Sequence, residues 1–534
     1  MIQNPIQTLT ARPLDTTKAI TRSQTARSVF GLEKLRDFQL QVLDAIDSSQ
    51  DCLAVSPTGS GKTLCFALPA ASEMLLPPSA RRLVLVVSPL IALMRDQATR
   101  LQSRGLECAL FDRTQSQEDR TAQWQNIDSG KAALLFISPE RLANANFRDR
   151  LAASRDVFLV AVDEAHCSSQ WGFNFRPEYR NIGLFLQSFP AAIRMALTAT
   201  ASPGIRSDMI TNLGLRNPQM FIADFARENI SLNVIQPGTF KDQSKIVIEL
   251  AVDSILEKSG ATIIYAATRK SAETIHADIS RKKIRAALYH GGLDSALRSR
   301  EQDDFLSGKI PCMVATSAFG MGIDKHDIRT VIHAGLPQNL EQYLQETGRA
   351  GRDGRPAVAT LVYHPRDYHT LRFMVEMQFP ETVLARAVVE TCIRECDQAA
   401  ASGRDRDAMI AAFLRGHPKA KQRDVEFAIE YGCRENLFKS MTSSSSNRHD
   451  DAFGMNNTLF TGAVPVDLDS FWRRYEFRRN ESFFKLEKMR LYAQSAARSK
   501  SAGKRILDSY FKETLADNAK PRKKASGHAP SAKH

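Results

Sequence analysis

Two acidic residues after a strongly apolar stretch are the first sign of chemistry in this chain. Asp163 and Glu164 follow VFLVAV (157–162), whose β-branched and aromatic residues predict a central strand buried on both faces of a parallel sheet. Ligands of such sheets bind at the carboxyl ends of the strands. We expect Asp163 to hold a hydrated Mg²⁺ and Glu164 to orient or deprotonate an attacking water. Without further motifs, a strand end that turns into solvent would be the better explanation.

A glycine-rich loop upstream supplies the further motif. Residues 56–63 read SPTGSGKT, which is the phosphate-loop pattern except that Ser56 replaces the first glycine. A short apolar strand precedes the loop and a helix start follows it, which is the context that phosphate binding requires. We expect Lys62 to pair with the β- and γ-phosphates and Thr63 to bind Mg²⁺. The loop residues expected to contact ATP are Thr58, Gly59, Ser60, Gly61, Lys62 and Thr63.

An aromatic segment follows the acidic pair. Residues 169–179, SQWGFNFRPEY, contain Trp171, Phe173, Phe175 and Tyr179 beside Arg176. Gly172 and Pro177 predict a loop, in which four aromatic side chains are hard to bury together. Aromatic rings beside a cation suit stacking on the bases of a nucleic-acid single strand. A loop folded onto a small core of its own is the alternative.

The segment DEAHCSSQWGFNFRPEYR closely resembles the aromatic-rich loop of the RecQ-family DNA helicases, a branch of helicase superfamily 2. The resemblance implies that this loop links single-strand binding to ATP hydrolysis. Phe173 and Asn174 stand where the family usually has His and Asp, which removes a polar relay through the family's His. The resemblance extends a coupling role to His166 and to Thr198 and Thr200 of MALTATAS (195–202), which joins the movements of two domains in the superfamily.

An upstream segment resembles the family's adenine-reading element. In FGLEKLRDFQLQV (30–42), Arg36 and Gln39 match the family pattern, whereas leucines replace its aromatic residues. A side-chain amide can bond both the donor and the acceptor edge of adenine. Without this resemblance, Gln39 would be interpreted as an exposed residue of a helix.

A second α/β unit is predicted after residue 223. The segments TIIYAATR, ALYHGGL and PCMVATSAFGMGIDK alternate with helical runs, which indicates another parallel sheet without a second phosphate loop. QETGRAGRDG then places Gln345, Arg349 and Arg352 at the spacing of the superfamily's last motif. Arg349 and Arg352 are expected on one helical face, from which they would reach a γ-phosphate as arginine fingers.

The last part of the chain carries most of its charge. From Ser470 onward there are 17 Lys and Arg against 6 Asp and Glu, which accounts for +11 of the formal net charge of +13. The basic end therefore suits polyanion binding. Leu507, Tyr510 and Phe511 have the spacing of a sliding-clamp box, with a helix docked on the protein itself as the alternative. An aromatic and basic run, 471–494, suits either phosphate contact or plain helix packing.

The cysteines do not form the four-cysteine zinc cluster that many RecQ proteins carry. Only Cys392, Cys396 and Cys433 are available after the core, with His417 as a conceivable fourth ligand, and Cys392 and Cys396 are expected one turn apart on a helix. We expect buried thiols and a branch of the family without zinc. Scattered cysteines without a secretory signal suit a reducing compartment, and no apolar run is long enough to cross a membrane.

These observations predict an α/β protein with two tandem RecA-like parallel-sheet domains, a helical region and a basic, partly disordered tail. The expected boundaries are a flexible N-terminus (1–24), an ATP-binding domain (25–222), a second RecA-like domain (223–366), a helical region (367–441), a linker (442–469) and a basic end (470–534). The expected function is a DNA helicase that uses ATP and Mg²⁺ on single-stranded and branched DNA, 3′-to-5′ by resemblance. The alternatives are an RNA helicase and a recruited scaffold that hydrolyses ATP poorly. The expected location is intracellular: cytoplasm or nucleoid in a bacterium, nucleus in a eukaryote.

Overall fold

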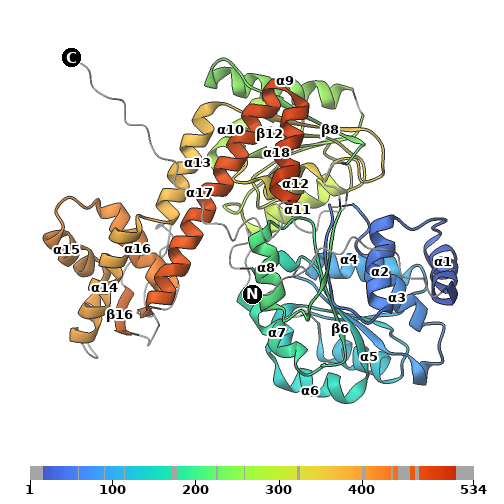
Figure 1. Cartoon of the computed structure of the whole chain (residues 1–534). Coiled ribbons are helices and arrows are strands. Elements are labelled where there is room, and N and C mark those ends of the chain that lie inside the picture. Colours follow the sequence, from blue (N-terminus) through green and yellow to red (C-terminus); the bar gives the residue numbers. More distant parts are fainter. Residues whose placement is uncertain are drawn as a thin grey trace. The chain divides into compact units, whose positions relative to one another are not determined.

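The computed structural model divides the chain into two compact units, which are described separately (Figure 1). The first unit holds residues 1–363 and 492–534, and the second holds residues 364–491. The described residues are 16–57, 59–89, 91–112, 115–169, 177–223, 227–257, 259–320, 325–399, 404–434, 437–442, 458–463 and 468–512.

The first half of unit one is built on a seven-stranded sheet in which every pairing is parallel. The strand order is β3-β4-β2-β5-β6-β1-β7. Apart from the edge strand β7, the strands are short apolar runs with buried residues on both faces, and two separate hydrophobic clusters cover the two sides of the sheet. The strands are β1 (Cys52–Val55), β2 (Leu83–Val87), β3 (Cys108–Phe111), β4 (Leu134–Ile137), β5 (Val157–Val162), β6 (Ile193–Thr198) and β7 (Gln219–Ile222).

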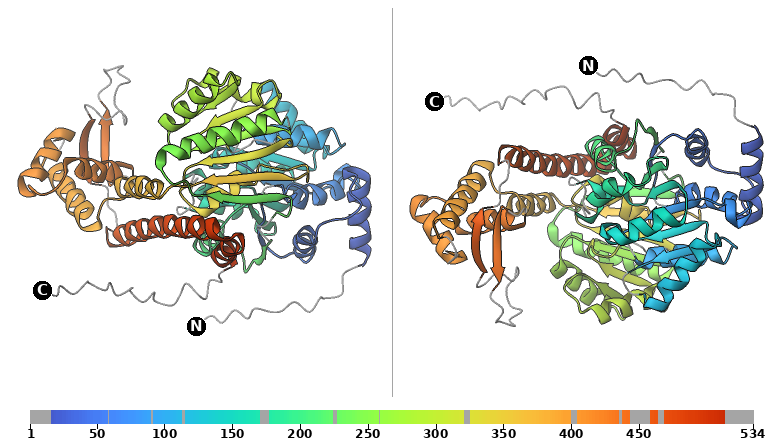
Figure 2. Two further views of the ribbon diagram at one scale, coloured as in Figure 1. Left: turned by 90° about the horizontal axis from the view of Figure 1, so that it is seen from above. Right: turned by 90° about the horizontal axis from the view of Figure 1, so that it is seen from below.

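Helices cover both faces of this sheet, as the two views of Figure 2 show. They are α1 (Thr16–Phe30), α2 (Asp37–Asp47), α3 (Leu64–Glu73), α4 (Ile91–Gln102), α5 (Gln117–Asp128), α6 (Ala145–Ser154), α7 (Arg180–Leu186) and α8 (Pro203–Asn212). This half is the RecA-like domain predicted from the phosphate loop and the acidic pair, and we call it domain 1.

The second half of unit one is a six-stranded parallel sheet in the order β10-β11-β9-β12-β13-β8, here called domain 2. Its two faces are again packed by separate apolar clusters. The strands are β8 (Ile230–Ile235), β9 (Ala261–Ala266), β10 (Ala286–Tyr289), β11 (Cys312–Ala315), β12 (Ile328–Ala334) and β13 (Ala357–Val362). The helices are α9 (Phe240–Leu256), α10 (Arg269–Arg281), α11 (Ser295–Leu306) and α12 (Leu340–Thr347).

Unit two is mostly helical, with its own apolar core around Val388, Ile429 and Tyr475. Its helices are α13 (Pro365–Gln378), α14 (Thr382–Ala399), α15 (Arg406–Gly416), α16 (Gln422–Arg434) and the first part of α17 (Leu468–Arg498). A small antiparallel sheet joins β14 (Arg404–Asp405), β16 (Thr458–Ala463) and β15 (Phe438–Thr442). The structure therefore has a strand pair where the sequence predicted the end of a helical region and a linker. The second strand of this pair is TLFTGA (458–463), a short segment that contains strand-forming residues.

The chain returns to unit one at its end. The last turns of α17 and the whole of α18 (Lys500–Lys512) belong to unit one, so the basic region predicted as one piece is divided between the units. Among the residues that the structure describes, no helix is long and apolar enough to cross a membrane.

Candidate ATP-binding site

The loop after β1 has the geometry of a phosphate cradle. Gly59 and Gly61 have positive φ angles of 80° and 83°, a conformation that glycine adopts without strain. A Cβ atom at Gly61 would lie 2.5 Å from the side-chain nitrogen of Gln39, so a larger residue would displace its neighbour. The Lys62 ammonium folds back over the loop and donates to the carbonyls of Ser56 (2.7 Å) and Pro57 (3.2 Å). Burial lowers the pKa of Lys62, and nearby Glu164 and Asp163 oppose that shift.

The two predicted adenine-reading side chains lie against the same loop. Arg36 donates to the carbonyl of Gly59 (3.1 Å), and the Gln39 amide donates to the carbonyl of Gly61 (3.2 Å). Gln39 is buried, so the structure does not support the view of it as an exposed helical residue. Both side chains therefore contact the phosphate loop directly.

Asp163 and Glu164 follow β5, as predicted. The carboxylate of Asp163 accepts the Glu164 amide at 2.9 Å, and Glu164 itself has a left-handed backbone with φ of 46°. Such a conformation is strained for a residue with a side chain and is typical of functional sites. Burial and the charge of Glu164 raise the pKa of Asp163 to about 6. Burial also acts to raise the pKa of Glu164, but a hydrogen bond and the positive charge of His166 outweigh it and lower that pKa to about 2. Glu164 therefore stays ionised to a lower pH than Asp163 does.

A buried chain of polar groups links Glu164 to the end of β6. His166 Nδ1 lies 3.2 Å from Glu164 Oε2 and 2.9 Å from Thr198 Oγ1, and the Thr198 hydroxyl donates to the Thr200 carbonyl at 3.2 Å. Since the Thr198 hydroxyl donates its hydrogen to the Thr200 carbonyl, its oxygen accepts a hydrogen bond from His166. Nδ1 of His166 therefore carries a proton. The three residues predicted to couple movements are thus connected to the acidic pair by direct contacts.

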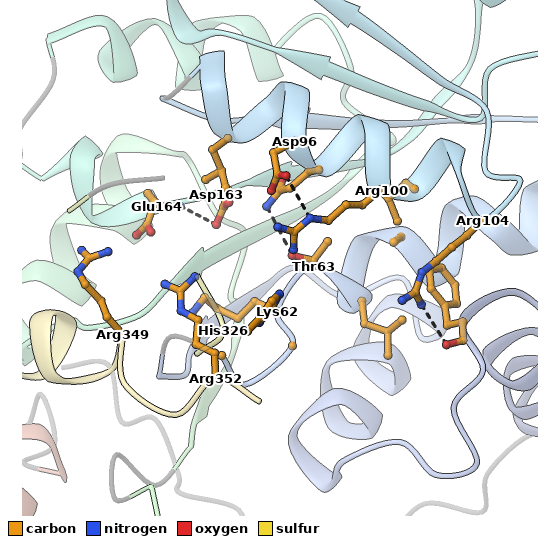
Figure 3. Close-up of a pocket in the computed structure, with 18 of the residues that line it drawn as sticks. Lys62, Thr63, Asp96, Arg100, Arg104, Asp163, Glu164, His326, Arg349 and Arg352 are labelled. Carbon is orange, nitrogen blue, oxygen red and sulfur yellow. Dashed lines mark hydrogen bonds and ion pairs between the residues drawn. The ribbon is translucent and has the colours of Figure 1, made fainter. Parts of the chain in front are cut away.

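Domain 2 completes the site. A cavity of about 410 Å³ is lined by Lys62, Thr63, Asp163 and Glu164 from domain 1 and by Gln345, Arg349 and Arg352 from domain 2 (Figure 3). Its volume is within the range of small-ligand pockets. The cavity therefore brings together the residues predicted to bind phosphate, to hold Mg²⁺ and to act as arginine fingers.

The arginine motif differs from its predicted form. Helix α12 ends at Thr347, so Arg349 and Arg352 lie on the turn after the helix and not on one helical face. Gly351 has φ of 57°, and a Cβ atom there would lie 2.4 Å from the Asn229 amide nitrogen. The glycines that make a helix unfavourable are the reason for the turn.

Two residues that the sequence did not single out hold this turn. Arg227 donates from Nη1 to the carbonyls of Gly348 (3.2 Å) and Ala350 (3.3 Å), and from Nη2 to that of Gly351. Asn229 donates to Gly351 (2.8 Å) and to a further carbonyl of the turn. Both residues belong to the short connection between the domains, where an Arg and an Asn have no motif to mark them. Gln97 was also missed, and its amide lies 3.5 Å from Thr63 Oγ1.

The predicted DNA-contacting residues have different outcomes. Trp171, Phe173, Phe175 and Arg176, like Thr58 of the phosphate loop, lie outside the described residues. Tyr179 is fully buried, and its hydroxyl donates to the main-chain carbonyl of Asp163 at 3.0 Å. Its expected role as a stacking surface is therefore wrong, because Pro177–Tyr179 forms a short 3-10 turn and Tyr179 belongs to one of the two apolar clusters that pack on the sheet. Tyr179 supports the acidic pair instead.

The predicted clamp-binding side chains are also buried. Leu507, Tyr510 and Phe511 are 8%, 2% and 0% exposed within unit one, so the helix docks on its own protein.

The predicted zinc candidates are only partly described by the structure. Cys392 is a buried thiol and His417 stacks on Phe413, whereas the side chains of Cys396 and Cys433 lie outside the described part of the chain. Within that part, no cluster of metal-binding side chains occurs.

Family models match both halves of this site. The model described as DEAD/DEAH box helicase matches residues 36–207, and the one described as Helicase conserved C-terminal domain matches residues 243–354. They correspond to domain 1 and to most of domain 2.

Curated relatives match the same region. The ATP-dependent DNA helicase RecQ of Haemophilus influenzae is 40% identical over 356 residues, which is 67% of this chain and 55% of that protein. The Bacillus subtilis protein of the same name is 40% identical over 65% of this chain and 57% of its own length. The chain thus spans little more than half the length of these relatives.

Solved structures support the fold. The helicase MrfA, with DNA and AMPPNP, matches 66% of this chain and 52% of its own chain, with a TM-score of 0.53 and 20% identity. The Mycobacterium smegmatis helicase Lhr, with single-stranded DNA and AMP-PNP, matches 85% and 61%, with a TM-score of 0.50 and 22% identity.

Proposed function

Since the chain belongs to the RecQ family of ATP-dependent DNA helicases, we propose that it hydrolyses ATP between its two RecA-like domains and uses the cycle to move along single-stranded DNA. The reaction would separate duplex or branched DNA, in the family's 3′-to-5′ direction. The observation that supports this most directly is the single cavity that holds Lys62, Asp163 and Glu164 together with Arg349 and Arg352.

The residues of the cavity fit ATP with Mg²⁺. The glycines of the phosphate loop, the Lys62 ammonium and the oxygen atoms of Thr63 and Asp163 line the cavity and are the kinds of group that a nucleotide and a hard cation require. Mg²⁺, when bound, neutralises phosphate charge. Asp163 and Thr63 would hold it, and Lys62 would leave the loop carbonyls to meet the phosphates.

Glu164 is the general base in this proposal. Its low pKa keeps it ionised, and His166 fixes its orientation from the side of β6. Arg349 and Arg352 would stabilise the charge that develops on the γ-phosphate, which in related reactions contributes roughly 10³-fold or more in rate. Gln345, from α12, lines the same cavity.

Coupling to DNA would use the chain from Glu164 through His166, Thr198 and Thr200. The aromatic segment begins directly after Ser169, whose hydroxyl donates to Asp208 of α8 at 2.9 Å. Single-stranded DNA that stacks on the aromatic segment could thus shift His166, which orients Glu164. Trp171→Ala should lower DNA stimulation of the ATPase while the rate without DNA stays unchanged.

The test is steady-state ATP hydrolysis with no polymer, single-stranded DNA, duplex DNA and RNA, with Lys62→Ala as the inactive control. Stimulation by single-stranded DNA supports the proposal. Stimulation by RNA alone would indicate an RNA helicase, and DNA binding without stimulation would indicate a scaffold. A sliding clamp is not part of the proposal because the side chains expected to meet it are buried.

A further inference from the structure

The C-terminal helix α18 contacts both RecA-like domains. The Tyr510 hydroxyl donates to the carboxylate of Glu341, on α12 of domain 2, at 2.7 Å. On the other side, Arg206 of α8 in domain 1 donates from Nη1 to the main-chain carbonyl of Phe511 at 3.3 Å. All four residues are at least nine-tenths buried. Consecutive residues of one helix therefore connect the two domains.

The chain before α18 adds contacts to domain 2. The Tyr492 hydroxyl, at the end of α17, lies 3.3 Å from that of Tyr343 on α12, with ring centres 5.2 Å apart. The turn into α18 is tight, since a Cβ atom at Gly503 would lie 2.5 Å from the Ala496 side chain. The two helix segments thus form a closely packed hairpin that holds α12 at two points.

Helix α12 is the element through which this hairpin can act on the ATP site. Glu341 lies one turn before Gln345, and the helix leads into the turn that carries Arg349 and Arg352. Glu346, on the same helix, is bound to His333 of β12 at 2.8 Å, which ties α12 to its sheet. A displacement of α12 would therefore move the arginine turn.

We propose that this hairpin is an internal strap that holds the arginine-bearing face of domain 2 near the phosphate loop of domain 1, with Tyr510 and Arg206 as positioning residues. The inference rests on the proposed function. Without the strap, a smaller fraction of molecules has both halves of the ATP site in place, and the apparent affinity falls by that fraction. Saturating single-stranded DNA, which in the proposed function is coupled to the ATP site, would restore the arrangement.

The first experiment compares Tyr510→Phe with Tyr475→Phe. Tyr475 is the matched control, because its buried hydroxyl also donates to an oxygen, that of Pro380 at 2.6 Å, but inside unit two. For Tyr510→Phe we expect kcat/KM for ATP without DNA to fall about tenfold, mainly through KM, and the rate at saturating DNA to stay within twofold. Tyr475→Phe should leave both values unchanged. Equal effects of the two variants, or an equal loss with and without DNA, would overturn the strap.

A double-variant cycle sharpens the test. The strap joins the two domains through two successive contacts, one to each domain, so the loss of either contact disconnects the domains. Arg206→Met and Tyr510→Phe should therefore each lower the DNA-independent kcat/KM, and the double variant should be no worse than the more impaired single one. Additive losses in this rate would mean two independent packing defects.

A distance measurement separates failure of the strap from failure of the proposed function. Spin labels on exposed positions of domain 1 and domain 2 report the spread of their separation without nucleotide, DNA or turnover. We expect Tyr510→Phe to broaden that distribution and Tyr475→Phe to leave it unchanged. Identical distributions would overturn the strap even in an active helicase, and a broadened one would support it even if the protein hydrolysed no ATP.

Discussion

Replacing Arg227 with methionine tests whether the connection between the domains positions the arginine turn. The change removes hydrogen bonds to three main-chain carbonyls, those of Gly348, Ala350 and Gly351. Hydrogen bonds of charged groups stabilise by about 1.5–3 kcal/mol each. Burial and the like charges of Arg352 and Arg36 lower the pKa of Arg227, so part of the stabilisation by these hydrogen bonds is offset. A net loss of about 2 kcal/mol would lower the ratio of ordered to disordered turns about thirtyfold.

We therefore expect kcat at saturating ATP and single-stranded DNA to fall 10- to 30-fold, less than the roughly 10³-fold loss expected when an arginine finger itself is removed. The matched control is Arg155→Met, since Arg155 also donates to three carbonyls, those of Ile127, Arg81 and Asp128, inside domain 1. The thermal midpoint of each variant shows whether folding is affected. A kcat within twofold of the original protein, or an equal fall for Arg155→Met, would refute the reasoning.

Three further predictions concern single side chains. Glu164→Gln should lower kcat by roughly 10²- to 10⁴-fold with ATP binding retained, as measured by hydrolysis and equilibrium binding; normal turnover would remove Glu164 as the base. Thr198→Val should reduce DNA stimulation several-fold and spare the rate without DNA, because it breaks the contact of His166 with β6; unchanged stimulation would separate this contact from coupling. Asp51→Asn should destabilise the fold by about 1–3 kcal/mol at pH 7 in urea unfolding. Burial would raise the pKa of Asp51, but hydrogen bonds from Arg216 and from the Arg194 amide lower it, so its stabilisation is fully present above the unfolded pKa of about 3.9 and is lost as the pH falls through the lower folded pKa. A difference between Asp51→Asn and the original protein that does not become smaller as the pH falls from 7 into the acid range would contradict this assignment.

The sequence predicted those parts of the molecule that local patterns determine. Apolar runs such as VFLVAV gave the buried strands, and the glycine-rich loop and the acidic pair gave one wall of the cavity, because the carboxyl ends of parallel strands meet at one edge. Arg349 and Arg352 were also placed correctly in the cavity, on the strength of a family motif. Their backbone conformation was predicted wrongly, because a helix was expected where Gly351 makes a turn.

Long-range packing could not be predicted in this way. Tyr179 was grouped with its aromatic neighbours in sequence, but its partner is the carbonyl of Asp163, and nothing local distinguishes a buried tyrosine from an exposed one. Arg227 acts on a turn more than a hundred residues later. The docking of α18 depends on Glu341 and Arg206, each far from it in sequence.

The order of elements along the chain has a consequence for biosynthesis. Unit two separates β13 from the hairpin that completes unit one, so α18 is made after every other described element of the protein. Domains fold largely as they emerge, beginning from the N-terminus. Both parallel sheets can therefore form while the residues that join them are still to be synthesised. A nascent or prematurely ended chain would carry all the described ATP-site residues but would lack the hairpin that connects domain 1 to domain 2. An assay of sheet folding would not detect this defect.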